Sequence, residues 1–178
     1  MFTENFVTKE KSKFKVLFVA SEAAPFAKAG GLGEVMLSLP RELRELGSDA
    51  RVMIPRYASI DREKNELVME QERLEVPTGA EKENESATMR CNVLRYNPKN
   101  NDRRRAPITY FLENEEYFEK RSNIYGYNDD AIRWALLSRG VLEFIKHSSW
   151  RPDVIIASDW QAGFIPNYLR TAYKNDPD

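Results

Sequence analysis

Short runs of apolar residues alternate along the chain with longer segments in which apolar residues recur every three or four positions. The short runs are rich in β-formers and indicate strands buried on both faces, whereas the three-to-four spacing indicates amphipathic helices. We predict four core strands at residues 15–20, 51–54, 108–112 and 154–157. We predict helices at residues 32–46, 114–120 and 131–147, and a last helix that runs through Tyr168 or beyond.

Two of the predicted helices carry further signals at or near their ends. Gly47 follows the last apolar residue of the first helix, which is a common way for a helix to end. Pro40 lies inside that helix, and because proline lacks an amide hydrogen we expect it to bend or split the helix. Asp129 or Asp130 is a candidate N-cap for the helix at 131–147.

The order of elements predicts the fold class. A strand, a glycine loop, a helix and a strand within residues 15–54 form a βαβ unit with a right-handed, parallel crossover. Segments 66–76 and 87–96 are typical of short strands in a polar context, which predicts an inserted β-hairpin or meander. The sequence thus predicts an α/β protein, a Rossmann-like parallel sheet flanked by helices, in one domain at 14–178 after a flexible leader at 1–13.

Composition and charge exclude several classes of partner. The 27 basic and 28 acidic residues leave a net charge of −1, which provides no large field to hold nucleic acid or an anionic membrane. The basic triplet at 103–105 is expected to be a solvated loop. Residues 1–13 lack the apolar centre of a signal peptide, and no segment has the roughly 20 apolar residues of a membrane span. A cytoplasmic location is therefore predicted.

The chain has one cysteine, Cys91, and one histidine, His147. They exclude a disulfide within this chain and a zinc site of the Cys/His type. Because no histidine lies near it in the sequence, we expect Cys91 to be a packing residue rather than a nucleophile. No metal site and no resident cofactor are predicted.

The loop at 28–33 reads Lys-Ala-Gly-Gly-Leu-Gly and follows the first core strand, where open parallel sheets place their ligand crevice. Adjacent glycines allow close approach of a ligand, and the next helix offers free N–H groups to an anion. Lys28 adds a mobile positive charge that suits a phosphate. Two interpretations stay open, a site for a phosphate-bearing substrate or a simple glycine turn with Lys28 in water.

Two familiar phosphate-binding motifs do not fit this loop. A P-loop ends in Gly-Lys-Ser/Thr, which is absent here. The dinucleotide fingerprint requires a small third residue, and Met36 stands at that position. Binding of NAD is therefore disfavoured.

The segment at 18–35, Phe-Val-Ala-Ser-Glu-Ala-Ala-Pro-Phe-Ala-Lys-Ala-Gly-Gly-Leu-Gly-Glu-Val, resembles the opening of bacterial glycogen synthases and plant starch synthases. The signature of that family at this point is Lys-Thr-Gly-Gly-Leu. Further matches follow in family order and carry the resemblance from residue 14 to about residue 170. They lie at residues 39–40, 46–47, 52–57, 110–112, 116–118, 124–134, 150–155 and 158–163.

The resemblance implies a fold of the GT-B type, in which two Rossmann-like domains face a cleft. Members of the family transfer glucose from ADP-glucose or UDP-glucose to the non-reducing end of an α-1,4-glucan, with retention of configuration. This chain would be the N-terminal half, without the C-terminal nucleotide-binding domain. The implied partners are the nucleotide-sugar donor, the glucan acceptor and a C-terminal GT-B domain supplied in cis or in trans.

The resemblance also implies roles for residues that match the family's motifs. The loop residues Lys28, Gly30, Gly31 and Leu32 would border the phosphates and sugar of the donor. Asp129 would be the catalytic carboxylate near the reacting glucose, where it favours positive charge at the anomeric carbon, while Lys28 favours negative charge on the leaving phosphate. A helix cap is an equally good fit to the position of Asp129 in the sequence.

Two further sets of substrate-binding candidates come from the resemblance. Arg133 would help to organise the loop near the substrate, although a structural ion pair is an equal alternative. The family's His-Asp-Trp-His motif stands here as Ser158, Asp159, Trp160 and Gln161. Serine donates a hydrogen bond but is no imidazole base, and Gln161 does not titrate near neutrality. Trp160 is expected to pack in the core rather than to stack on a ligand.

Three hypotheses about function follow. The first is one half of a glucan synthase, inactive alone because a single domain cannot preorganise a site between two. The second is a non-catalytic module that binds a glucan or a nucleotide sugar through a degenerate site. The third is a small Rossmann-like protein used for protein contacts only. Lys28, Gly30, Gly31 and Asp129 favour the first hypothesis, whereas Ser158 and Gln161 favour the second.

Overall fold

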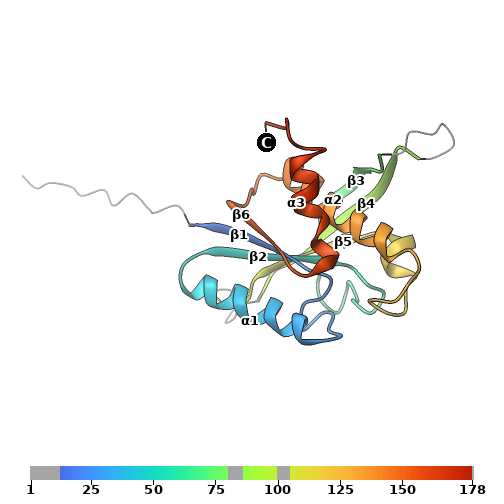
Figure 1. Cartoon of the computed structure of the whole chain (residues 1–178). Helices are drawn as coiled ribbons and strands as arrows, with labels where there is room; N and C mark the ends of the chain where they lie inside the picture. Colours follow the sequence, from blue (N-terminus) through green and yellow to red (C-terminus); the bar gives the residue numbers. More distant parts are fainter. Residues whose placement is uncertain (1–12, 80–85, 100–104, 178) are drawn as a thin grey trace, which may run out of the picture.

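The computed structural model describes residues 13–79, 86–99 and 105–177. Six strands form one sheet in the order β3-β4-β5-β2-β1-β6, and Figure 1 shows α1 on one face and α2 with α3 on the other. The strands are β1 (Lys15–Val19), β2 (Asp49–Pro55), β3 (Val68–Pro77), β4 (Thr88–Tyr96), β5 (Ile108–Glu113) and β6 (Val154–Ala157). The helices are α1 (Gly31–Glu45), the π-helical turn η2 (Glu115–Glu119), α2 (Asp130–His147), the 3-10 turn η3 (Trp160–Ala162) and α3 (Phe164–Arg170).

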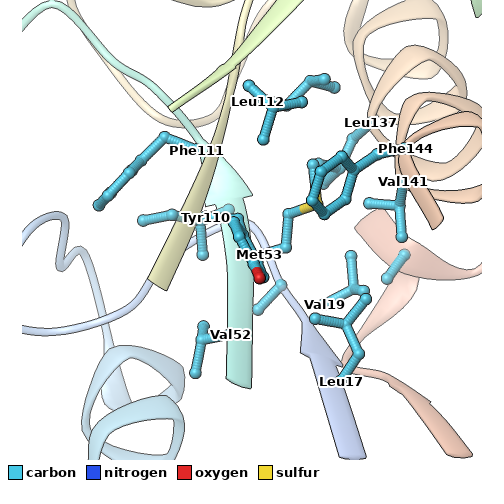
Figure 2. Packing of buried hydrophobic residues seen from close by; sticks show 14 of the residues in the cluster. Leu17, Val19, Val52, Met53, Tyr110, Phe111, Leu112, Leu137, Val141 and Phe144 are labelled. Atoms are coloured by element: carbon cyan, nitrogen blue, oxygen red, sulfur yellow. The ribbon is translucent and has the colours of Figure 1, made fainter. Parts of the chain in front are cut away.

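The parallel part of the sheet consists of β5, β2, β1 and β6, the four strands predicted from the apolar runs. The three inner strands are buried on both faces because helices cover both, which is why their sequences lack polar alternation. Figure 2 shows part of this core, in which Met53 and Tyr110 face Phe144 of α2. The rings of Tyr110 and Phe144 lie 4.8 Å apart.

The predicted inserted hairpin is formed by β3 and β4. Strand β4 pairs antiparallel with β5 and β3 pairs antiparallel with β4, so the hairpin extends the main sheet. The outer strand β3 is irregular, with register shifts between Met69 and Leu74 and a positive φ of 54° at Arg73. Its core-facing residues, Leu74 and Val76, are buried.

Helix α1 corrects one expectation. It runs without a break through Pro40, so the prediction of a split helix is wrong. Met36 and Pro40 lie four residues apart, share the buried face and pack the helix against the sheet, which maintains the helix across the missing amide. The end is as predicted, since Gly47 follows the helix with a φ of 96°.

Helix α2 is the most deeply packed helix of the described chain, with ten buried residues. It passes so close to β5 that a Cβ added to Gly140 would lie 2.7 Å from Cδ2 of Leu112. With any larger residue at this position, the Leu112 side chain or the helix would have to shift. The closeness fixes where the amino end of α2 stands relative to the ends of the strands.

Some predictions fall partly or wholly outside the described residues. Most of the leader at 1–13 does so, as do the first two arginines of the basic triplet. The third, Arg105, pairs with Glu45 at 3.0 Å.

Within the residues that the structure describes, no helix is long and apolar enough to cross a membrane.

Candidate active site

The carboxyl ends of the parallel strands point the same way, so the loops that follow them meet at one edge of the sheet. The hydroxyl of Ser21, after β1, lies 2.8 Å from the hydroxyl of Tyr125 in the loop before α2. The hydroxyl of Tyr57, after β2, donates to the carbonyl of Ser21 at 2.6 Å. The amide of Ser158, after β6, donates to the carbonyl of Val19 at 2.9 Å. Four segments far apart in the sequence therefore form one cluster.

Burial raises the pKa of the Tyr125 phenol, and the nearby Glu22 carboxylate raises it further. Burial also raises the pKa of Tyr57 well above its ordinary value. Both phenols are therefore neutral at physiological pH, and their O–H groups can donate hydrogen bonds. The cluster is held by neutral hydroxyls around one buried carboxylate.

That carboxylate, Glu22, was missed by the sequence analysis. It is 2% exposed, and it accepts hydrogen bonds from the amides of Ala29 and Gly30, the latter at 3.0 Å. These bonds turn the loop back onto the end of β1. The signal that could have revealed it is a charged residue just beyond a buried apolar strand, three residues after the end of β1, where a buried carboxylate requires nearby donors.

The glycine loop opens onto solvent at the start of α1. Gly30 is the N-cap and carries no side chain to occupy the helix end. A Cβ added at Gly31 would meet no atom within 4 Å, so there is space above the first turn. Leu32 is partly buried and packs against the core, which anchors the turn. The loop thus presents a helix N-terminus to a ligand, and such ends attract anions.

Lys28 stands beside this open end. Its ammonium lies 2.5 Å from a carboxylate oxygen of Glu34, and the two side chains are 50% and 56% exposed. An exposed ion pair contributes little stability, on the order of 0–1 kcal/mol. The ammonium can therefore exchange Glu34 for a phosphate at low cost.

Asp129 occupies the N-cap position of α2, but its side chain makes no capping hydrogen bond. Its carboxylate instead accepts a hydrogen bond from Arg121 at 2.6 Å and stays partly exposed. The neighbouring Asp130 accepts from the amide of Gly126 at 2.9 Å. The side chain of Asp129 is thus used for an ion pair at the surface rather than for the helix end.

Arg133 is fully buried and binds the segment before α2 to the helix. Its guanidinium donates to the carbonyls of Tyr117 at 2.8 Å and Ile124 at 3.0 Å, and to Asp130 at 2.5 Å. Its Nη2 has no hydrogen-bond partner. In this conformation Arg133 organises the loop and does not reach solvent.

The loop after β6 carries the other candidates. Asp159 is exposed and has φ 66° and ψ 177°, a strained conformation for a residue with a side chain. Its carboxylate accepts from the amide of Trp160 at 2.7 Å. Ser158 is half-buried, while Gln161 is 3% exposed and its Oε1 has no hydrogen-bond partner.

Trp160 corrects a second expectation. Its side chain is 56% exposed, so the prediction of a core residue is wrong. Its ring makes an edge contact with the buried Trp134, and the two ring centroids lie 6.2 Å apart. The turn η3 that carries Trp160 packs against α2 through Gln161 and Ala162, which are buried, while Trp160 stays at the surface.

Cys91 lies away from this cluster, on β4. It is buried, and burial raises the pKa of its thiol to about 12, so the thiol stays protonated. This agrees with the expected packing role. Across residues 13–79, 86–99 and 105–177, no group of three or more His, Cys, Asp or Glu side chains is arranged to hold a metal ion.

The arrangement defines one wall of a polar site. An open helix N-terminus and a half-exposed ammonium suit a phosphate. The carboxylates of Asp159, which is exposed, and Asp129, which is partly exposed, suit a sugar with developing positive charge. A sheet of this topology with such a wall at the carboxyl edge is that of the GT-B class of glycosyltransferases.

The comparison with known families identifies one family within this class. The model of the starch synthase catalytic domain matches residues 15–178, and the chain belongs to this family. The chain is 42% identical over 164 residues to a glycogen synthase of Geobacillus thermodenitrificans, covering 91% of this chain and 31% of the relative. It is 42% identical over 159 residues to a glycogen synthase of Clostridium botulinum, covering 89% and 30%.

A comparison with solved structures points to the same family. The catalytic domain of starch synthase IV from Arabidopsis thaliana, bound to ADP and acarbose, matches with a TM-score of 0.77 and 25% identity. The match covers 91% of this chain and 31% of that chain. The chain thus spans about a third of the length of the proteins it matches.

Proposed function

We propose that this chain supplies the glycine-loop wall of a glucan synthase site. The complete site transfers glucose from ADP-glucose or UDP-glucose to the non-reducing end of an α-1,4-glucan, with retention of configuration. The observation that carries the proposal is the open start of α1, with Lys28 beside it and Glu22 holding the loop. A cytoplasmic location stays a prediction from the sequence.

The proposed roles follow from charge. The amides of Gly31 and Leu32 and the ammonium of Lys28 face the donor phosphates and stabilise the negative charge of the leaving group. The carboxylate of Asp129 faces the reacting glucose and favours positive charge at its anomeric carbon. For Asp129 to do so, its ion pair with Arg121 must open, or one of its carboxylate oxygens must be free to face the sugar.

Two buried residues act as positioning residues. Glu22 fixes the path of the glycine loop through two amides, and Arg133 fixes the segment from Tyr117 to Ile124. Neither needs to touch the substrate for its loss to misplace a group that does.

In the loop after β6, Ser158, Asp159 and Gln161 contribute hydrogen bonds to the sugar. None of the three acts as an imidazole base. The unpartnered Oε1 of Gln161 is an acceptor available for this purpose.

The rest of the site comes from a second domain, in cis or in trans. The starch synthase IV structure holds ADP and acarbose, which supports a nucleotide and a carbohydrate as the two ligand classes here. Since the chain spans 31% of that protein, we propose that the isolated chain is inactive. A site between two domains is not preorganised by one of them.

One observation favours a second candidate function. Ser158 stands at the position where the family that this sequence resembles has a histidine at the active site. A module that binds a glucan or a nucleotide sugar without catalysis would tolerate this change.

The test is glucosyl transfer by the purified 178-residue chain, with labelled ADP-glucose and UDP-glucose supplied separately and glycogen as acceptor. We expect no transfer above a Lys28→Ala control. Transfer above that control would contradict the two-domain site. Addition of a family C-terminal domain in trans then separates the candidates, because rescue supports a synthase half and continued inactivity with retained glucan binding supports the module.

A further inference from the structure

Asp129 is held at two places, by its backbone and by its side chain. Its carbonyl accepts hydrogen bonds from the amides of Ile132 at 2.9 Å and Arg133 at 3.1 Å, which ties it to the first turn of α2. Its carboxylate accepts one hydrogen bond from Arg121, at 2.6 Å, through Oδ2. Within the described part of the chain, no hydrogen bond reaches the other oxygen, Oδ1. One oxygen of Asp129 is therefore anchored, and the other is available.

Arg121 divides its donors between two partners. An arginine and a carboxylate often pair through two parallel hydrogen bonds, which occupy both carboxylate oxygens. Here Nη2 of Arg121 donates to Asp129, while Nε donates to the carbonyl of Glu116 at 3.0 Å. The two partners come from different segments, so together they fix the guanidinium and leave Oδ1 of Asp129 unused.

The ring of Tyr127 supports the same guanidinium. The guanidinium carbon of Arg121 lies 5.1 Å from the centre of this ring, and that of Arg133 lies 4.8 Å from it. The phenol oxygen of Tyr127 accepts a hydrogen bond from the amide of Asn123 at 2.9 Å, which holds the ring in place. Arg121 is thus held by a carbonyl, a carboxylate and an aromatic ring, although its side chain is 20% exposed.

The carbonyl that receives Arg121 is itself fixed. Glu116 belongs to η2, a π-helical turn, and such turns are frequent at functional sites. Phe118 anchors the turn because its side chain is fully buried. The next carbonyl of the turn, that of Tyr117, accepts from Arg133. Successive carbonyls of one turn therefore hold both Arg121 and Arg133.

We infer that Arg121 is a positioning residue for the transfer reaction. It anchors Oδ2 of Asp129 so that Oδ1 faces the anomeric carbon, and the ion pair stays closed while glucose is transferred. A carboxylate stabilises developing positive charge effectively only when it is held in place before the reaction. The inference rests on the proposed role of Asp129, and it selects an ion pair that leaves one oxygen free over one that opens.

The first test uses the 178-residue chain and requires no activity. Three-bond NMR couplings to the β-protons of Asp129 report its χ1 rotamers. We expect one rotamer in the wild type and averaging over several in Arg121→Gln. Lys120→Gln is the matched control, because Lys120 is the neighbouring cation and pairs with Glu115 and Glu116 instead. An averaged Asp129 in the wild type, or an unchanged single rotamer in Arg121→Gln, would overturn the inference.

The second test measures steady-state kinetics in a two-domain form, with a family C-terminal domain supplied in trans. We expect Arg121→Gln to lower kcat about 10–100-fold and to leave KM for the donor within about twofold, because Arg121 acts through Asp129 and not on the substrate. Arg121→Lys should restore part of the loss, since it retains a positive charge beside Asp129. In an Asp129→Asn background, Arg121→Gln should have no further effect.

The outcomes separate this inference from the proposed function. Near-normal turnover in Arg121→Gln, with Asp129→Asn impaired, would remove the positioning role and leave the proposed function in place. A raised donor KM with unchanged kcat in Arg121→Gln would assign this residue to substrate binding and would also refute the inference. Near-normal turnover in Asp129→Asn would refute the proposed role of Asp129, and this inference with it.

Discussion

Both ends of the parallel strands carry charged side chains, but the two ends use them differently. At the amino end, Asp49 of β2 accepts from Arg51 at 3.0 Å and from the indole of Trp150 at 2.7 Å, with Arg44 at 3.5 Å. The Arg51 guanidinium also lies 4.1 Å from the centre of a Trp150 ring. Asp49, Arg44 and Arg51 line a hollow of about 760 Å³, and both arginines are bound to the Asp49 carboxylate.

At the carboxyl end some charged groups are enclosed as well, among them Glu22 and Arg133, but others are not. Lys28 is half exposed, Asp159 is exposed, and the start of α1 at Gly31 is open. The comparison teaches that the size of a hollow and the number of its charges do not identify a ligand site. The distinguishing feature is whether the polar groups still have bonding capacity that the fold itself does not use.

The largest expected effect lies at the open end. In a complete two-domain form, Lys28→Ala should lower turnover about 10²–10³-fold, as expected for loss of one transition-state charge partner. The unfolding midpoint should not change, because the ion pair with Glu34 is exposed. Steady-state kinetics measures the first quantity, and Lys28→Arg is the control that retains charge. Near-normal turnover in Lys28→Ala would remove this residue from the site.

The second effect lies at the enclosed end. Asp49→Ala leaves Arg51, Arg44 and the Trp150 indole without their shared acceptor, and it should reduce the free energy of unfolding by about 2–3 kcal/mol. Urea denaturation of the 178-residue chain measures it. Glu34→Ala is the matched control, since it removes an exposed acidic partner and should cost less than about 0.5 kcal/mol. Equal costs would abolish the distinction between the two ends.

A third effect tests the enclosed carboxylate within the open end. Glu22→Ala removes the single carboxylate oxygen, Oε2, that accepts from the amides of both Ala29 and Gly30. We expect a loss of about 1–2 kcal/mol and faster hydrogen exchange at those two amides. Exchange rates at Asp159 and Trp160 serve as the internal control. Unchanged exchange at Ala29 and Gly30 would mean that Glu22 does not hold the loop.

The smallest effect is a dependence of stability on pH. Burial would raise the pKa of Asp49, but hydrogen bonds and charge from Arg51, with Trp150 and Arg44, outweigh it and hold the pKa below its ordinary value. The stabilisation is therefore complete above the unfolded pKa of about 3.9 and is lost as pH falls through the lower folded value. Urea midpoints between pH 3 and 6 should show this slope in the wild type. The slope should be shallower in Asp49→Asn, and an identical slope would contradict the assignment.

The strands could be predicted because apolar runs such as Val-Leu-Phe-Val report burial directly. The glycine loop could be predicted as a candidate site because its chemistry is local. Glu22 and the Arg121 partner of Asp129 could not, since both depend on how the backbone turns between them. The exposure of Trp160 was missed for another reason, namely that an apolar residue in a sequence does not reveal what covers it. The expected split at Pro40 does not occur, because packing of the buried face outweighs local propensity, whereas a bend there stays a prediction.

The contact between Gly140 and Leu112 has a consequence for how this sequence can vary. Asp129 stands at the amino end of α2, eleven residues or about 16 Å from Gly140 along the helix. A single methyl group at Gly140 would require either the buried Leu112 side chain or the helix to shift, and a shift of the helix would displace its amino end. Selection for activity in a library randomised at this position should therefore return glycine, although the residue meets no ligand, because the constraint is one of distance and not of chemistry.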